Sequence, residues 1–274
     1  MSSTPPGETE RDRVPVLLEA TFAGVRLLTL NRPAKKNALS GALVRAIVAG
    51  VAAAADDDDV RVIGLTGAGD AFCAGADLAP RDRASGGSAG GPITDDDVAR
   101  FVRGTRVDCE QRVVAGINGV AVGAGVALAM CADIRIASST ARFHPGYARA
   151  GSSPDGGLSW TLPQEVGHEH AMRFLLDPQM IDAQAALALG LVGEVVSADE
   201  FDEAFRGTCR RIAAVAPQAA RQTKRLVTRA GLLADLDAHL RDEVDLARRA
   251  LASDDGREAV RAIFEKRKPN FTGR

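Results

Sequence analysis

The feature that most constrains the fold is a glycine-rich segment, INGVAVGAGVALAMCADIRIA, at residues 117–137. Its pattern predicts the end of a buried strand, a glycine-rich bend, a short apolar helix and a second strand, at residues 113–117, 118–125, 126–131 and 134–137. The glycines leave little side chain at the bend, so a ligand can approach the backbone closely. The helix behind the bend begins with unpaired N–H groups and a positive dipole end, which stabilise a bound phosphate or an oxyanion.

The glycine spacing does not match the known phosphate-binding loops. Gly119, Gly123 and Gly125 do not fit GxGxxG, and no Lys-Ser or Lys-Thr pair follows them. Taken alone, the segment therefore also fits a tight strand-to-helix turn of any α/β protein. The rest of the chain has to decide between a ligand-binding bend and a simple turn.

Composition narrows the class of protein. A chain of 274 residues predicts one large domain, or a domain with a helical appendage, and its 46% hydrophobic content is ample for a core. The formal net charge is −2, from 34 basic and 36 acidic residues, which argues against a nucleic-acid partner held by a basic surface. No apolar run approaches the roughly 20 residues of a membrane span, so no membrane partner is expected.

The cysteines and the N-terminus indicate a cytoplasmic protein. The four cysteines are scattered without a CxxC pair, as in proteins with reduced, buried thiols; Cys73 lies in a bend but is expected to pack in the core. Residues 1–13 are polar and proline-containing without an apolar centre, and are predicted to be a disordered lead-in. The acidic run at 56–59 lacks calcium-loop spacing, and His168 and His170 are isolated, so no metal site is predicted.

A strand followed by a bend and a helix recurs along the chain. A continuous apolar strand at 60–66 leads into the bend GAGDAFCAGADL at 67–78, and the strand at 112–117 leads into the bend described above. The recurrence predicts stacked turns of a β-β-α spiral rather than a doubly wound nucleotide-binding fold. A third turn at residues 154–157 precedes a helix, and the pattern from residue 168 onward is mostly helical.

The two bends suggest a shared function. Each strand-to-helix bend can direct one backbone N–H at a single point, and two such donors stabilise an enolate or a tetrahedral anion. Spacing alone does not show that the bends converge. Several motifs, in order, do resemble one family: LNRPAKKNALS, AFCAGADL, the segment at 117–137, PDGGLSWTLP and FEKRKPNF are similar to the crotonase (enoyl-CoA hydratase/isomerase) superfamily over roughly residues 14–271.

The resemblance implies an architecture and a ligand. It implies an α/β fold with a crotonase-like β-β-α spiral core at 14–197, and a C-terminal helical trimerisation region at 198–274. It implies a homotrimer or a dimer of trimers, with an acyl-CoA thioester as the small-molecule substrate. Coenzyme A then enters as part of the substrate, and no separate cofactor is expected.

The resemblance also assigns residues. The two oxyanion donors fall on the amides of Ala76 and Ala124. The residues expected near coenzyme A are Lys35, Lys36, Ala74, Asp77, Leu78, Phe264 and Lys266. Lys268 is an alternative to Lys266 because both flank Arg267, and the tail would act across a subunit boundary. Solvated surface roles remain the alternative for the basic residues.

The catalytic acids decide the reaction. A hydratase of this family uses two glutamates, but the matching positions hold Ala127 and Tyr147, which cannot do carboxylate acid–base work. Asp155, in SPDGG, resembles the aspartate of some family isomerases and of a family dehalogenase. One carboxylate beside an enolate can move a proton between two carbons. The alternative role for Asp155 is a helix N-cap, and Tyr147 is either a polar helper or a pocket wall.

These residues predict an acyl-CoA-processing enzyme that acts through a thioester enolate, with an isomerase-type proton shuttle at Asp155. Enoyl-CoA hydration is the first alternative. Dehalogenase-like hydrolysis, with Asp155 as the nucleophile, and a non-catalytic acyl-CoA-binding homologue are lower alternatives.

Overall fold

The computed structural model describes residues 14–77, 91–147, 153–177, 179–230, 249, 252–265 and 267–273. The predicted lead-in at 1–13 and part of the predicted C-terminal helical region, residues 231–248, lie outside these ranges. The strands are β1 (Leu17–Phe22), β2 (Val25–Leu30), β3 (Val62–Gly67), β4 (Ala71–Cys73), β5 (Arg112–Ile117), β6 (Val120–Val122), β7 (Ile134–Ser138), β8 (Arg142–His144), β9 (Ile181–Asp182) and β10 (Glu194–Val196).

The helices follow the predicted periodicity. They are α1 (Gly41–Ala55), α2 (Asp95–Arg103), α3 (Ala124–Met130), α4 (Leu158–Val166), α5 (His168–Leu176), α6 (Ala183–Leu189), α7 (Phe201–Ala213), α8 (Pro217–Ala230) and α10 (Asp254–Glu265). A 3-10 turn, η2 (Pro33–Lys35), follows β2, and a π-helical turn, η3 (Gly104–Asp108), continues α2. The Ser40 hydroxyl accepts the Leu43 amide and caps α1.

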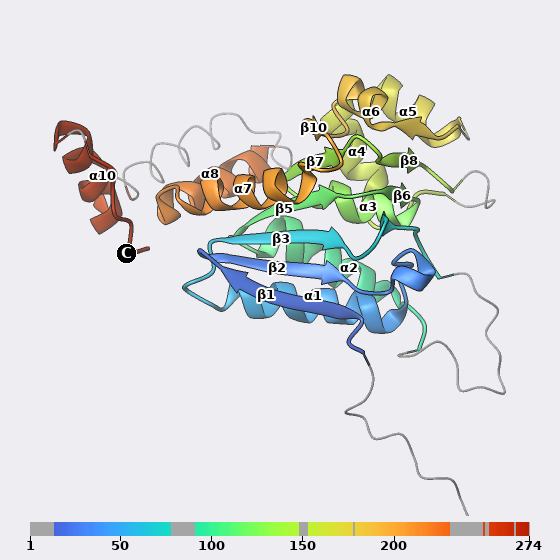
Figure 1. The fold of residues 1–274 in the computed structure, drawn as a ribbon, viewed down its shortest axis with the longest axis horizontal. Helices are drawn as coiled ribbons and strands as arrows, with labels where there is room; N and C mark the ends of the chain where they lie inside the picture. The colour runs from blue at the N-terminus through green and yellow to red at the C-terminus, as the bar shows by residue number, and fades with distance from the viewer. Residues whose placement is uncertain are drawn as a thin grey trace, which may run out of the picture.

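The strands form two sheets that alternate along the chain. One sheet has the order β1-β2-β3-β5-β7-β10 and the other β4-β6-β8-β9. Each of β3, β5 and β7 in the first sheet is followed directly by β4, β6 or β8 in the second (Figure 1). The pairings β2–β3, β3–β5, β5–β7 and β4–β6, β6–β8 are parallel. The recurrence seen in the sequence is therefore the predicted spiral.

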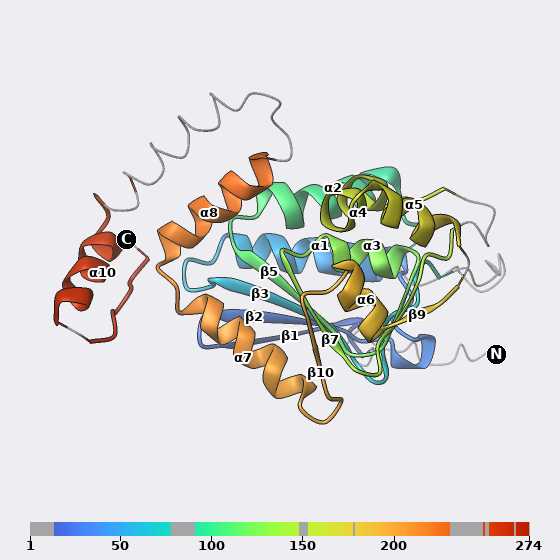
Figure 2. The same cartoon turned by 90° about the horizontal axis from the view of Figure 1, so that it is seen from above.

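The central strands β3 and β5 of the larger sheet are mostly buried on both faces, as their continuous apolar sequences require, whereas the edge strand β1 is largely exposed. One face packs with α1 and α3 in a core that includes Leu28, Leu43 and Leu128. On the other face, α7 places Phe205 against Val62 and Val114. Figure 2 shows α7 on the side of the sheet opposite to α1 and α3. Among the described residues, no helix is both long and apolar enough to cross a bilayer.

One boundary differs from prediction in a way that matters. The helix after the glycine-rich bend was expected to start at Val126, but α3 starts at Ala124. Gly123 has φ 52° and ψ −117°, a conformation that favours glycine, and it turns the chain directly into the helix. Ala124 is consequently the first helical residue, whose N–H has no partner within the helix.

Candidate active site

The first bend is held by the loop that follows β2. The Leu39 amide donates to Gly75 O at 2.7 Å, and the Asp77 amide donates to Leu39 O at 2.9 Å. In this parallel bridge the two bonds flank Ala76, whose own N–H points away from the loop. Among the described residues, we find no acceptor for the Ala76 amide.

Two side chains stabilise that loop, and neither was predicted from the sequence. Asn37 is fully buried and donates through Nδ2 to Ala68 O at 2.9 Å and Ala71 O at 2.7 Å. Arg32 forms an ion pair with Asp77 at 2.8 Å. The left-handed φ of 55° at Asn37 suits an asparagine, and the NRPAKKN turn was the available signal.

The second bend lies against the first. A Cβ added to Gly75 would lie 2.7 Å from Val122 O and 3.7 Å from the Ala124 nitrogen. A Cβ on Gly125 would lie only 2.2 Å from Cys73 O. The backbones of the two bends therefore lie in direct contact, which spacing alone could not show. Among the described residues, the Ala124 amide also lacks an acceptor.

Both amides belong to residues that line one cavity of about 250 Å³. Its wall is mostly apolar and includes Val44, Ile47, Val98, Phe101 and Leu128. Ala127, at one of the positions where a hydratase glutamate was sought, lies in this wall and is 2% exposed. Two N–H donors at one apolar cavity suit the oxygen of a thioester as negative charge develops on it.

Asp155 also lines this cavity, and the residue is exposed to solvent. The Tyr147 hydroxyl donates to the Asp155 carboxylate at 2.7 Å. Burial, followed by the hydrogen bond to Asp155, raises the pKa of Tyr147 above its ordinary range, so this hydroxyl stays protonated near neutral pH. The second hydratase position therefore supplies a hydrogen-bond donor to the remaining carboxylate.

The alternative role of Asp155 as a helix cap is wrong. The N-cap of α4 is Gly157, with φ 75° and no side-chain cap bond. Asp155 contributes only its backbone oxygen, which accepts the Leu158 amide at 3.0 Å. The Asp155–Gly156 turn stands directly beside Ala127, since a Cβ on Gly156 would lie 2.9 Å from Ala127 Cβ. The carboxylate is thus left for other chemistry.

The other predicted residues are placed as follows. Lys36 pairs with Asp70 at 2.5 Å on the surface, and Lys35 is exposed beside it at the end of η2. Ala74 is half-buried, and its amide donates to Lys36 O at 2.9 Å. None of these residues lines the 250 Å³ cavity.

Three predicted coenzyme A contacts lie outside the described residues or far from the cavity. Leu78 and Lys266 lie outside the described residues, and Phe264 lies in α10. In this chain α10 lies at the opposite end of the molecule from α3 and α4 (Figure 1). Cys73 is fully buried in the core, as predicted. This burial raises the pKa of its thiol to about 12.

The sequence matches known proteins along most of its length. The family model described as enoyl-CoA hydratase/isomerase matches residues 20–274. A probable enoyl-CoA hydratase of Rhodobacter capsulatus is 36% identical over 92% of this chain and 95% of its own length. A 1,2-epoxyphenylacetyl-CoA isomerase of Escherichia coli is 34% identical over 94% of this chain and 98% of its own length.

Solved structures show the same architecture. An enoyl-CoA hydratase of Bacillus anthracis superimposes with a TM-score of 0.85 and 28% identity, covering 94% of this chain and 100% of its own. An enoyl-CoA hydratase/isomerase structure from Mycobacterium abscessus gives a TM-score of 0.84 and 32% identity, with coverage of 94% and 100%.

Proposed function

Because the chain belongs to the enoyl-CoA hydratase/isomerase family, we propose that this acyl-CoA-processing enzyme moves a double bond within its substrate. Asp155 takes a proton from a carbon of the acyl chain, and the electrons of that C–H bond pass to the thioester oxygen. The Ala76 and Ala124 amides hold the resulting enolate oxygen. The same carboxyl group then returns the proton to another carbon, and the carbonyl re-forms.

The observation that carries this proposal is that neither position where a hydratase of this family has a glutamate holds a carboxylate. Asp155 lines the same cavity as Ala76 and Ala124, while the two hydratase positions hold Ala127 and Tyr147. Hydration needs a group that activates water as well as one that protonates carbon, whereas a shuttle needs one carboxylate. The isomerase of Escherichia coli among the relatives supports the shuttle.

Hydration is the second candidate, and the relatives favour it. A probable enoyl-CoA hydratase of Rhodobacter capsulatus and a crotonyl-CoA hydratase of Syntrophomonas wolfei are 36% and 34% identical to this chain. In a hydration, Asp155 would have to serve both steps, or a second acid would have to complete the site. Asp95 is the candidate for that acid, because it lines the same cavity from the start of α2.

The assembly proposed for this enzyme is a homotrimer or a pair of trimers, with coenzyme A bound as part of the substrate. Lys35, Lys36, Ala74 and Asp77 would lie along the coenzyme A, together with Leu78. Since α10 lies far from the cavity of its own chain, Phe264 and Lys266 would act on a neighbouring copy.

The test uses 2-enoyl- and 3-enoyl-CoA substrates of short and medium length in heavy water, with products followed by mass spectrometry. The shuttle predicts double-bond migration without gain of water. We expect Asp155→Asn to lower turnover at least about 100-fold, the usual contribution of a general acid–base group. Asp95→Asn is the matched control, a carboxylate of the same cavity, and should keep turnover within about threefold of the unmodified enzyme.

Other outcomes would contradict the proposal in different ways. Gain of one water would identify a hydratase, and an equal loss in both variants would identify Asp95 as the second acid. Unchanged turnover in Asp155→Asn would remove this carboxylate from the mechanism. Binding of acyl-CoA without any turnover in the unmodified protein would indicate a non-catalytic homologue.

A further inference from the structure

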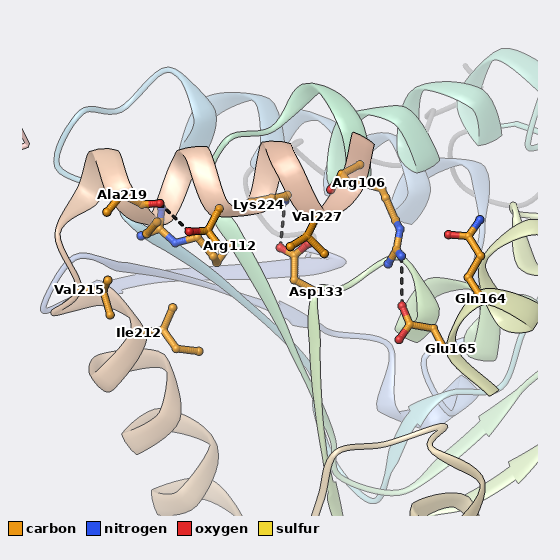
Figure 3. Close-up of a pocket in the computed structure, with 13 residues that line it drawn as sticks. Arg106, Arg112, Asp133, Gln164, Glu165, Ile212, Val215, Ala219, Lys224 and Val227 are labelled. Carbon is orange, nitrogen blue, oxygen red and sulfur yellow. Dashed lines mark hydrogen bonds and ion pairs between the residues drawn. The ribbon is translucent and has the colours of Figure 1, made fainter. Parts of the chain in front are cut away.

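A second cavity, of about 420 Å³, lies between α8, the start of β5, the segment before β7 and the end of α4 (Figure 3). It shares no lining residue with the candidate active site. Its lining includes the apolar residues Ile212, Val215 and Val227. It also includes arginines, one lysine and two acids, so the cavity is amphipathic.

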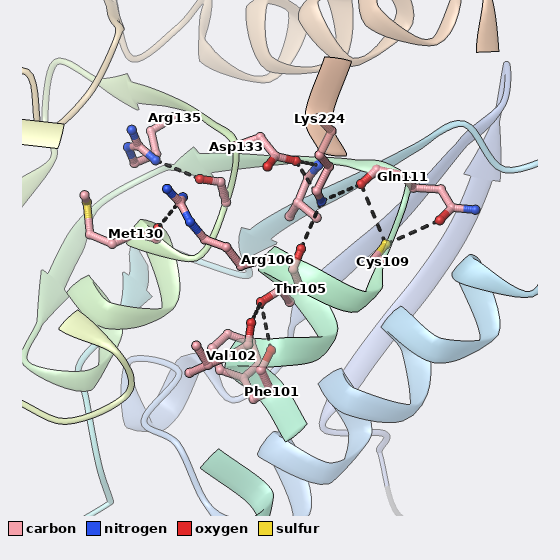
Figure 4. A network of polar contacts seen from close by, with 12 residues as sticks. Phe101, Val102, Thr105, Arg106, Cys109, Gln111, Met130, Asp133, Arg135 and Lys224 are labelled. Atoms are coloured by element: carbon pink, nitrogen blue, oxygen red, sulfur yellow. Dashed lines mark hydrogen bonds and ion pairs between the residues drawn. The ribbon is translucent and has the colours of Figure 1, made fainter. Parts of the chain in front are cut away.

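The two acids of this cavity are already neutralised. The Asp133 carboxylate accepts the Val113 amide at 2.7 Å and pairs with Lys224 at 3.0 Å. The Glu165 carboxylate bridges Arg106 and Arg135, each at 3.1 Å. Figure 4 shows Lys224 held further by the carbonyl oxygens of Thr105 and Gln111. Each acid of the cavity thus already has a cationic partner.

Among the described cations that line the cavity, Arg112 is the one without an ion-pair or hydrogen-bond partner. Its residue is 7% exposed, and none of its three guanidinium nitrogens has a hydrogen-bond partner. Within the described part of the chain, the remaining buried side-chain polar atom without a partner is Nε of Arg106, which lines the same cavity. Burial, and next the nearby Arg221, lower the pKa of Arg112 to about 10. A buried guanidinium without a partner is costly, so the site favours an anion.

We propose that this cavity binds an aliphatic monocarboxylate, with its carboxylate on Arg112 and its chain against Ile212, Val215 and Val227. A guanidinium presents two parallel N–H donors that match the two oxygens of a carboxylate. The apolar residues of the same cavity favour a carboxylate that carries an aliphatic chain over a bare inorganic anion. The guanidinium nitrogens lie below the cavity surface, so binding includes a turn of the Arg112 side chain toward the cavity.

The test is calorimetric titration of the purified full chain with octanoate, repeated with octan-1-ol and with acetate. We expect saturable octanoate binding at one site per chain and at least about tenfold weaker binding of either control, since each lacks one half of the ligand. Octanoate should also raise the unfolding temperature with increasing concentration.

Variants separate the site from general charge effects. Arg112→Met keeps an unbranched side chain without the charge, and should weaken octanoate binding at least about tenfold while raising the unfolding temperature of the free protein. Val227→Asp places a negative charge at an exposed lining position and should weaken binding similarly. Arg225→Met removes an equal charge from the exposed side of α8 and should leave binding within about twofold.

Three outcomes would overturn the proposal. The first is no octanoate binding, and the second is equal binding by Arg112→Met and the unmodified chain. The third is competition between octanoate and an enoyl-CoA that Asp155→Asn still binds, which would place octanoate in the active site. A changed oligomeric state in Arg112→Met with unchanged octanoate binding would identify a carboxylate of a second copy as the partner of Arg112. Since none of these results depends on turnover, they leave the proposed reaction untouched.

Discussion

Tyr147 and Asp155 form the pair on which the proposed chemistry depends. Tyr147 is 7% exposed and donates to the carboxylate at 2.7 Å, whereas Asp155 faces the cavity. A buried, protonated phenol fixes the direction of the carboxylate without competing for the proton, because the pKa of the phenol is raised. In the proposed reaction Tyr147 is therefore a positioning residue, and Asp155 is the group that would meet the substrate.

Tyr147→Phe tests this division of roles. Loss of one hydrogen bond to a charged group should lower kcat about tenfold, which corresponds to about 1.4 kcal/mol of barrier. KM should change less than about threefold, because the amides of Ala76 and Ala124 remain in place. The measurement is steady-state turnover of enoyl-CoA beside urea unfolding.

Stability is the control for that variant. Water can reach the exposed Asp155 carboxylate, so the free energy of unfolding should change by less than about 1 kcal/mol. A normal kcat would make Tyr147 a pocket wall only. A fall in activity that follows a matching fall in stability would make its role structural.

At the scale of elements, the site depends on two backbone segments, the bends that carry Ala76 and Ala124, which pack together with no side chain between them. A Cβ on Gly119 would lie 2.0 Å from Asp70 O, and one on Gly125 would lie 2.2 Å from Cys73 O. The first contact joins the residue before β6 to the residue before β4, and the second joins the first turn of α3 to the end of β4. The relative position of the two amides is thus set by glycines on one side and by Asn37 on the other.

Gly125→Ala should push α3 away from β4. The clash is with backbone, which cannot turn aside as a flexible side chain can, so we expect a loss of about 2–3 kcal/mol in the free energy of unfolding. Turnover should fall as well, because the loss of one oxyanion donor costs about 3–4 kcal/mol of barrier. Urea unfolding and kcat measure the two effects.

Gly104→Ala is the matched control for the bend variant. Gly104 has helical φ and ψ, and a Cβ there meets nothing within 4 Å. The substitution should be neutral or stabilising by about 0.5–1 kcal/mol. Equal stability and equal kcat of the two alanine variants would show that the two backbone segments pack less tightly than these contacts imply.

The sequence predicted the elements of this site better than it predicted their arrangement in space. Continuous apolar strands and recurring bends predicted the spiral, because burial on both faces leaves a local pattern. The start of α3 was misplaced, because apolar periodicity begins at Val126 while the turn depends on the φ of Gly123. Contact between Gly75 and Ala124, and between Tyr147 and Asp155, depends on long-range packing that no local pattern encodes.

At the scale of the whole molecule, the helices after β10 are tied to the core at particular points. Phe205 of α7 packs on Gly116, where an added Cβ would lie 2.8 Å from its ring. Lys224 of α8 is 8% exposed and reaches Asp133 and the carbonyls of Thr105 and Gln111. One ammonium group thus joins α8 to η3 and to the segments that precede β5 and β7 (Figure 4).

Lys224→Met should loosen this junction strongly. It leaves the Asp133 carboxylate and two carbonyl oxygens without their shared donor, and removal of one partner from a buried ion pair costs about 3–5 kcal/mol. Arg225→Met, one residue along on the exposed side of α8, should cost less than about 0.5 kcal/mol. Adding Asp133→Asn to Lys224→Met should recover part of the loss, because no buried charge then remains unpaired. Urea unfolding gives the three free energies, and amide hydrogen exchange should show the greatest loss of protection in α8 and η3. Equal stability of Lys224→Met and Arg225→Met would mean that apolar contacts, and not this ammonium group, hold α8 on the sheet.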